Sequence, residues 1–171
     1  PTLSTVEPGV HEGYYTDAEL RELVAYAAER FVTVVPEVEL PGHVQAALAA
    51  YPELGNTDAG EPVTEPWPRF GVNPRTLAPT EDALAFGRAA IDALCELFDS
   101  PWIGIGGDEV PVTEWEQSAA AGERMRQLGL GTPHDVQPWF TAHFVAHVRG
   151  RGRTALAWDE VLEGDVPEGV R

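Results

Sequence analysis

The 171-residue sequence contains no lysine, and its 28 acidic residues against 11 arginines give a formal net charge of −17. An acidic excess of this size repels phosphate groups, which argues against nucleic acid and anionic membrane surfaces as partners. The single cysteine, Cys95, excludes an internal disulfide framework. Because no run of about 18 apolar residues is present, we expect no membrane span. The chain begins at Pro1 rather than at a methionine, so we leave its cellular location unknown.

What the sequence does contain is an alternation of helical and strand-like segments. Apolar residues at helical spacing predict helices over 17–30, 44–50, 80–98, 114–128 and 136–149. Apolar, largely β-branched runs predict strands over 31–35, 102–105 and 154–158, and the Pro- and Gly-rich stretch 51–79 predicts a long loop. Such an alternation is typical of parallel strands with right-handed crossovers. We therefore predict an α/β fold without an internal domain boundary.

Acidic residues follow the predicted strand over 102–105. Residues 103–110 read Ile-Gly-Ile-Gly-Gly-Asp-Glu-Val, so Asp108 and Glu109 come directly after two glycines. Neighbouring side chains on a strand face opposite ways, so the pair can serve one site only where the backbone turns, as glycine permits. Two carboxyls in different environments can divide acid and base roles. The alternative is that Asp108 caps a following helix and Glu109 is solvated.

The other two predicted strands also end in polar or aromatic residues. Glu37, Glu39 and His43 follow the first strand, and taken alone they slightly favour surface glutamates and a histidine near a helix N-terminus. Trp158 ends the third strand, where an indole is more often a core residue but can also form the floor of a sugar site. In parallel α/β folds the carboxyl ends of the strands build the site, so these residues are candidates to join Asp108.

Two further patterns give no support for a cofactor or a metal. The glycines at 104, 106 and 107 lack the third glycine of a dinucleotide-binding turn, and acids stand where phosphate would lie. His143 and His147 have the spacing of metal ligands on a helix, but no third ligand is evident. We therefore expect them to be surface histidines, and we predict neither a cofactor nor a metal site.

Together, the motifs resemble those of the β-N-acetylhexosaminidases of glycoside hydrolase family 20. The matching segments, in the family's order, are Tyr14-Tyr15-Thr16, Pro36-Glu37-Val38-Glu39-Leu40-Pro41-Gly42-His43, Tyr51-Pro52-Glu53-Leu54, Gly106-Gly107-Asp108-Glu109 and Trp158-Asp159-Glu160. The resemblance extends over essentially the whole chain. It implies that the chain forms part of a (β/α)8 barrel, about strands three to five with their helices.

The resemblance also implies substrate-assisted, retaining hydrolysis of terminal β-linked N-acetylglucosamine or N-acetylgalactosamine. Glu109 would be the general acid and then the general base, while Asp108 would hold the substrate's acetamido group. Trp158 would line the sugar pocket, and His43 and Glu39 would orient the acid/base residue. We also expect Glu109 to be buried, so that it stays protonated near neutral pH.

The sequence departs from the family pattern at two positions. Glu39 stands where the family usually has aspartate, and Gly104 stands where it usually has histidine. Both changes affect the surroundings of the acidic pair rather than the pair itself. Because such a barrel needs roughly 250 residues, we expect the chain to be a piece of a larger enzyme. Alone, it would expose sheet edges and apolar faces, and be inactive or self-associated.

Two other functions remain open. One is a non-catalytic carbohydrate-binding or scaffold module that keeps part of the barrel. The other is a hydrolase with a conventional two-carboxylate site, in which Glu109 pairs with Glu39 or Glu160.

Overall fold

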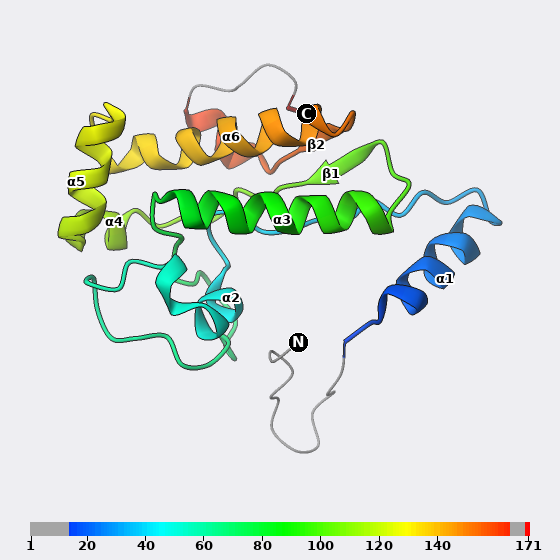
Figure 1. The fold of residues 1–171 in the computed structure, drawn as a ribbon, viewed down its shortest axis with the longest axis horizontal. Helices are drawn as coiled ribbons and strands as arrows, with labels where there is room; N and C mark the ends of the chain where they lie inside the picture. Colours follow the sequence, from blue (N-terminus) through cyan, green and yellow to red (C-terminus); the bar gives the residue numbers. More distant parts are fainter. Residues whose placement is uncertain (1–13, 165–169) are drawn as a thin grey trace.

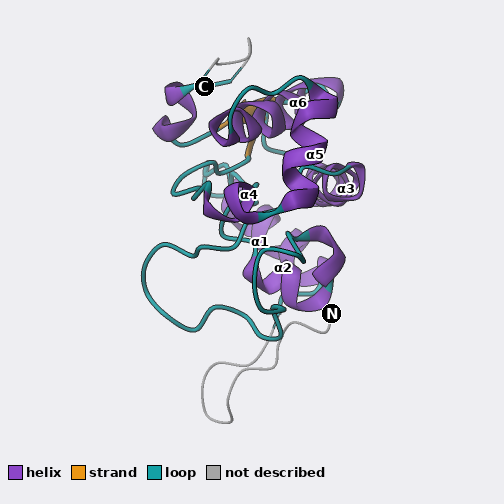
Figure 2. Ribbon diagram, turned by 90° about the vertical axis from the view of Figure 1, so that its left-hand side faces the viewer, coloured by secondary structure: helices purple, strands orange, loops and turns teal. Residues whose placement is uncertain are grey.

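The computed structural model describes residues 14–164 and 170–171. Two long helices, α3 and α6, lie side by side with the short strands β1 and β2 next to them, while α1 projects at one end (Figures 1 and 2). The elements are α1 (Asp17–Ala28), α2 (Gln45–Ala50), η1 (Pro52–Leu54), α3 (Glu81–Leu97), β1 (Trp102–Gly104), α4 (Thr113–Gln117), α5 (Ala119–Leu128), η2 (Pro133–Asp135), α6 (Val136–Gly150), β2 (Thr154–Leu156) and η3 (Asp159–Glu163).

β1 and β2 pair in parallel, as the alternation of elements predicts. Trp102 lies opposite Thr154, and Gly104 lies opposite Leu156. Both strands are shorter than predicted, although the N–H of Ile105 still donates to the carbonyl of Leu156 at 2.9 Å. The two strands therefore end side by side, and the residues that follow them begin at the same edge of the sheet.

The prediction of a strand over 31–35 is wrong. Phe31 has a left-handed φ of 59° and a fully exposed side chain. Strand-like pairing begins later, at a single parallel bridge between Glu37 and Gly104, and the N–H of Val38 donates to the Gly104 carbonyl at 3.0 Å. The β-branched pattern is typical of a strand covered on both faces. In the part of the chain that the structure describes, these side chains stay largely uncovered, so the burial that stabilises such a strand is missing.

The core lies between α3, α6 and the two strands. Phe140 and Phe144 of α6 are buried and stack with their ring centroids 5.7 Å apart. A Cβ at Gly87 of α3 would lie 2.4 Å from the ring of Phe144, so the missing side chain lets the two helices close on each other. Ile103 and Ala155 from the strands are fully buried in the same cluster.

Connections between the elements also follow from local chemistry. The helix predicted over 114–128 is interrupted at Ser118, whose hydroxyl accepts from the N–H of Ala121 and so caps α5 as a separate helix. The same hydroxyl bonds to the carboxylate of Asp58, which fixes the break against the long loop. As predicted, residues 51–79 contain little regular structure, with η1 as their one helical turn. Among the described helices, none combines the length and apolar character needed to cross a bilayer.

Candidate active site

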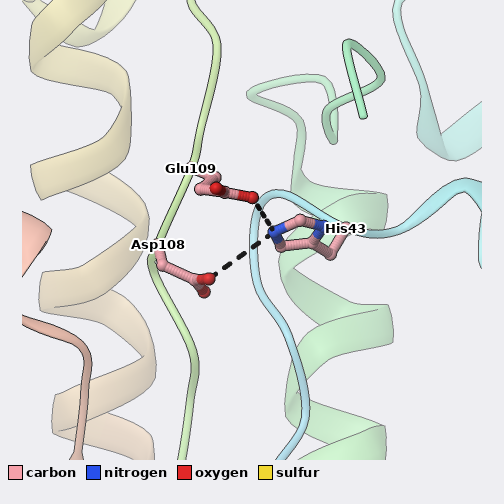
Figure 3. A group of neighbouring side chains, drawn as sticks. All are labelled: His43, Asp108 and Glu109. Carbon is pink, nitrogen blue, oxygen red and sulfur yellow. Dashed lines mark ion pairs between the residues drawn. The ribbon is translucent and has the colours of Figure 1, made fainter. Parts of the chain in front are cut away.

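The irregular segment over 105–109 follows β1 and carries the acidic pair; we call it the turn, because its backbone departs from the extended conformation. Gly106 and Gly107 have φ angles of 69° and 100°, and Glu109 has a φ of 47°, all in the left-handed region. Glycine adopts this region without steric cost, so the two glycines let the chain turn as soon as the strand ends. The turn removes the alternation of a strand, and Asp108 and Glu109 extend their side chains toward the same imidazole (Figure 3).

That imidazole belongs to His43, which lies on the neighbouring chain segment. Its Nε2 is 3.4 Å from Oε2 of Glu109 and 3.6 Å from Oδ2 of Asp108 (Figure 3). His43 has a left-handed φ of 53°, a conformation that costs a non-glycine residue about 1–3 kcal/mol and is concentrated at functional sites. The structure therefore brings three of the predicted site residues together.

Glu39 lies behind the acidic pair. Its Oε2 is buried and would be only 2.0 Å from a Cβ placed on Gly106, so only glycine fits at that point of the turn. Its half-burial, then the adjacent carboxyl of Asp108 and the charge of Glu37, raise the pKa of Glu39 to about 8. Glu39 is thus mainly protonated at neutral pH. Its O–H can donate to Asp108, whose buried Oδ1 has no other partner among the described residues.

Glu37 occupies the space that a side chain at position 104 would need. A Cβ at Gly104 would lie 2.7 Å from Oε2 and 2.8 Å from Cβ of Glu37. The Glu37 side chain can therefore take this position only because residue 104 is a glycine. The carboxylate so placed adds to the negative charge around Glu39 and helps to keep that residue protonated.

Trp158 reaches the turn through its backbone. Its N–H donates to the carbonyl of Gly106 at 3.1 Å, which links the end of β2 to the turn after β1. Trp158 is 50% exposed, so it is not part of the core that the described residues form. Its contact with a sugar stays a prediction.

Glu109 is less buried than expected, with a side chain that is 46% exposed in the described chain. The carboxyl that burial protonates is that of Glu39, which the sequence placed only among the residues around the pair. The sequence predicted that Glu109 would be withdrawn from water. In the structure, Glu39 is the carboxyl whose pKa is raised by burial.

Sequence reasoning missed two residues that hold the turn. Nε2 of Gln137, in the first turn of α6, donates to the carbonyl of Gly107 at 2.6 Å. A Cβ at Gly107 would lie 2.6 Å from Cγ1 of Val161, so the side chain of Val161 packs directly on the turn. No motif marks either residue, because each acts through a contact between segments distant in the sequence.

The site can also be considered as a place for a cation. The nearest ligand atoms of His43, Asp108 and Glu109 lie within 4.8 Å of one another. The three side chains are also of the kinds that carry acid–base chemistry. We therefore interpret them as acid–base and positioning groups rather than as a metal centre.

The two histidines with metal-ligand spacing on α6 have separate partners. Nδ1 of His143 bonds to the carbonyl of Trp139 at 2.7 Å, and Nε2 of His147 is 2.8 Å from the carboxylate of Asp92. His143 is exposed, as expected of a surface histidine, whereas His147 is partly buried beside Asp92.

Comparisons with known proteins agree with this geometry. The family model described as glycosyl hydrolase family 20, catalytic domain, matches residues 3–170. A β-hexosaminidase of Porphyromonas gingivalis is 37% identical over 157 residues, which are 90% of this chain and 20% of that protein. A β-hexosaminidase of Vibrio furnissii is 32% identical, with 91% and 25% covered.

Solved structures give the same result. A β-N-acetylhexosaminidase from Bacteroides fragilis matches with a TM-score of 0.79 and 33% identity, over 93% of this chain and 31% of that one. A Vibrio harveyi exo-β-N-acetylglucosaminidase, solved in complex with N-acetylglucosamine, matches with a TM-score of 0.80 and 28% identity, over 94% and 25%. This chain thus spans between 20% and 31% of the length of the relatives described here.

Proposed function

Because this chain belongs to glycosyl hydrolase family 20, we propose that the protein hydrolyses terminal, non-reducing β-linked N-acetylhexosamine residues by a substrate-assisted, retaining mechanism. Its fold is α/β and forms part of a (β/α)8 barrel. One observation carries the proposal: Asp108 and Glu109 leave a single turn at the ends of parallel strands and converge on His43. In such barrels, active sites lie at this end of the strands.

In the proposed first step, Glu109 donates its proton to the glycosidic oxygen as the bond to the leaving group breaks. The substrate's acetamido oxygen forms a bond to the anomeric carbon, which produces a cyclic, oxazolinium-like intermediate. The Asp108 carboxylate accepts a hydrogen bond from the acetamido N–H and stabilises the positive charge that develops on that group. Nε2 of His43, 3.4 Å from Oε2 of Glu109, lies where it can donate a hydrogen bond to the carboxylate that remains after the proton has left.

In the proposed second step, the Glu109 carboxylate removes a proton from water, which attacks the anomeric carbon. The bond to the acetamido oxygen breaks, and the acetamido group is restored. Two displacements at the same carbon give overall retention of configuration. The adjacency of Asp108 and Glu109 supports this scheme, because it calls for two carboxyls at one sugar ring, one at the glycosidic oxygen and the other at the acetamido group.

Glu39 and Trp158 take the remaining roles in the proposal. A protonated Glu39 donates to Asp108 and leaves the negative charge on Asp108, where the acetamido N–H needs it. Trp158, held beside the turn through the Gly106 carbonyl, offers an exposed indole face to the sugar. We propose that the substrates are oligosaccharides or glycoconjugates that carry N-acetylglucosamine. The complex of the Vibrio harveyi relative with this sugar supports the proposal. The scheme needs no cofactor.

Paired substrates test the proposal in the intact protein. We expect hydrolysis of an aryl N-acetyl-β-glucosaminide but not of the corresponding plain β-glucoside, because the latter lacks the attacking group. Equal turnover of both would eliminate acetamido participation and favour a two-carboxylate site. Binding of N-acetylglucosamine without turnover of either would favour the carbohydrate-binding module instead.

A further inference from the structure

The Gly106–Gly107 turn sets the direction of Asp108, yet its own backbone does not fix its shape. Glycine is free to adopt many backbone conformations, so two consecutive glycines place little steric restriction on the peptide that follows. The carbonyl of Gly107 and the N–H of Asp108 belong to one planar peptide unit. Whatever fixes the Gly107 carbonyl therefore also fixes the plane that holds the N and Cα of Asp108, the point from which its side chain leaves the backbone.

One side chain binds that carbonyl. Nε2 of Gln137 donates to the oxygen of Gly107 at 2.6 Å, and the side chain of Val161 packs against the Gly107 Cα. Gln137 is itself held in place, because its neighbour Val136 and the following Phe140 are both fully buried in the core. The hydrogen bond thus connects a helix start that is anchored in the core to a turn whose glycines restrict it little by themselves.

We propose that Gln137 is a positioning residue for Asp108, acting through the Gly107 carbonyl. In α6 it lies 30 residues beyond the glycine that it binds. Its effect on catalysis rests on the proposed function, whereas the hydrogen bond and the orientation of Asp108 do not. Gln137 touches no reacting atom in this scheme; it keeps the carboxylate where the acetamido N–H must bind.

The test is Gln137→Met, which has a similar length but no donor, in the intact protein with two aryl N-acetyl-β-glucosaminides that differ in leaving-group quality. Misplacement of a catalytic group lowers kcat by up to about 100-fold, so we expect a 10- to 100-fold loss with both substrates. An activated leaving group does not restore the rate, since acetamido attack is the impaired step. Loss of proton donation by Glu109, in contrast, is largely rescued by such a leaving group.

Two further variants separate positioning from general destabilisation. Gln127→Met makes the same change on the exposed face of α5, where Gln127 bonds only to surface groups, and should leave kcat unchanged. Gln137→Glu keeps the length but donates only when its carboxyl is protonated. Its kcat relative to that of Gln137→Met should therefore rise as the pH falls toward the ordinary carboxyl pKa of about 4.3.

Labelled carbons report the positioning without turnover. In the intact protein, the ¹³C resonances of the Gly107 carbonyl and the Asp108 carboxyl should both shift in Gln137→Met and remain in place in Gln127→Met. Unchanged resonances, or a kcat within twofold of the wild type with both substrates, would overturn the role of Gln137. Absence of any hydrolysis by the wild type with shifted resonances would instead overturn the proposed function and leave the positioning intact.

Discussion

Two glutamates that are withdrawn from water in this molecule have opposite surroundings. Glu114, in α4, is 5% exposed; its Oε1 is 2.7 Å from Nη1 of Arg75, and its Oε2 accepts from the N–H of Thr76 at 2.8 Å. Among the described residues, the charged groups that influence the ionisation of Glu39 are the carboxyls of Asp108 and Glu37, and neither is a cation. One carboxylate is fully compensated, and the other is held among groups that oppose its ionisation.

This difference separates structural from chemical use of the same side chain. Glu114 fastens the long loop over 51–79 to α4 through Arg75 and Thr76. The environment of Glu39 costs folding free energy, and such an arrangement is concentrated where a protonation state must be controlled. The comparison predicts that variants near Glu39 impair activity, while variants at Glu114 impair stability.

The largest expected effect is at the acidic pair. Glu109→Gln removes the proton donor and should lower kcat about 10²- to 10⁴-fold with a poor leaving group, and much less with an activated one. The free energy of unfolding should stay nearly unchanged, because the Glu109 side chain is 46% exposed. Steady-state kinetics and urea unfolding of the intact protein measure both quantities. A stability loss equal to that of a Glu114 variant would abolish the distinction.

Glu114→Ala is the converse experiment. Removing one member of a buried ion pair leaves the Arg75 charge and the Thr76 N–H without a partner, at a cost of about 3 kcal/mol in unfolding free energy. Glu123→Ala, which breaks the exposed pair with Arg126, should cost less than about 1 kcal/mol. Urea midpoints compare the two variants, and equal losses would show that the loop over 51–79 does not depend on Glu114.

Helices were predictable from the sequence because their signals are local. The apolar spacing over 17–30 and 80–98 corresponds to α1 and α3, and a capping box of Thr16 and Glu19 begins α1. The prediction of a strand over 31–35 failed, since a β-branched pattern of this kind forms a strand only when other elements cover both of its faces. Ser118 interrupts the helix over 114–128 through a contact with Asp58, 60 residues away, which no local pattern contains.

The same contrast between local signals and contacts across the fold applies to the candidate site. The convergence of Asp108 and Glu109 with His43 follows from a motif and from the rule that parallel strands end at one edge. The role of Gln137 and the placement of Glu37 against Gly104 depend on contacts across the fold, so sequence reasoning did not reach them. Motifs thus predicted which residues gather, while packing decides which carboxyl is protonated.

Gly106→Ala sharpens the comparison at the backbone. Gly106 and Gly129 have similar φ angles, 69° and 73°, so alanine at either position should cost roughly 1–2 kcal/mol from the left-handed conformation. Around Gly129 no atom lies within 4 Å of the added Cβ, whereas at Gly106 the Cβ would meet Oε2 of Glu39 at 2.0 Å. We therefore expect the larger stability loss, and a loss of activity, only in Gly106→Ala. Thermal unfolding and kcat measure both effects, and equal behaviour would show that Glu39 moves aside freely.

The smallest expected effect is a slope of stability with pH. The pKa of Glu39 is raised to about 8 in the folded protein, against about 4.3 for an ordinary glutamate in the unfolded chain. Between these values the folded state holds a proton that the unfolded state has lost, so the contribution of Glu39 to stability is complete below the lower value and disappears as the pH rises through about 8. Glu39→Gln cannot titrate, and we expect the unfolding free energy of the wild type to decline, relative to that of the variant, across this window. Parallel stability curves would mean that Glu39 is ionised in the fold, and Asp108 would then lack the donor that we assign to it.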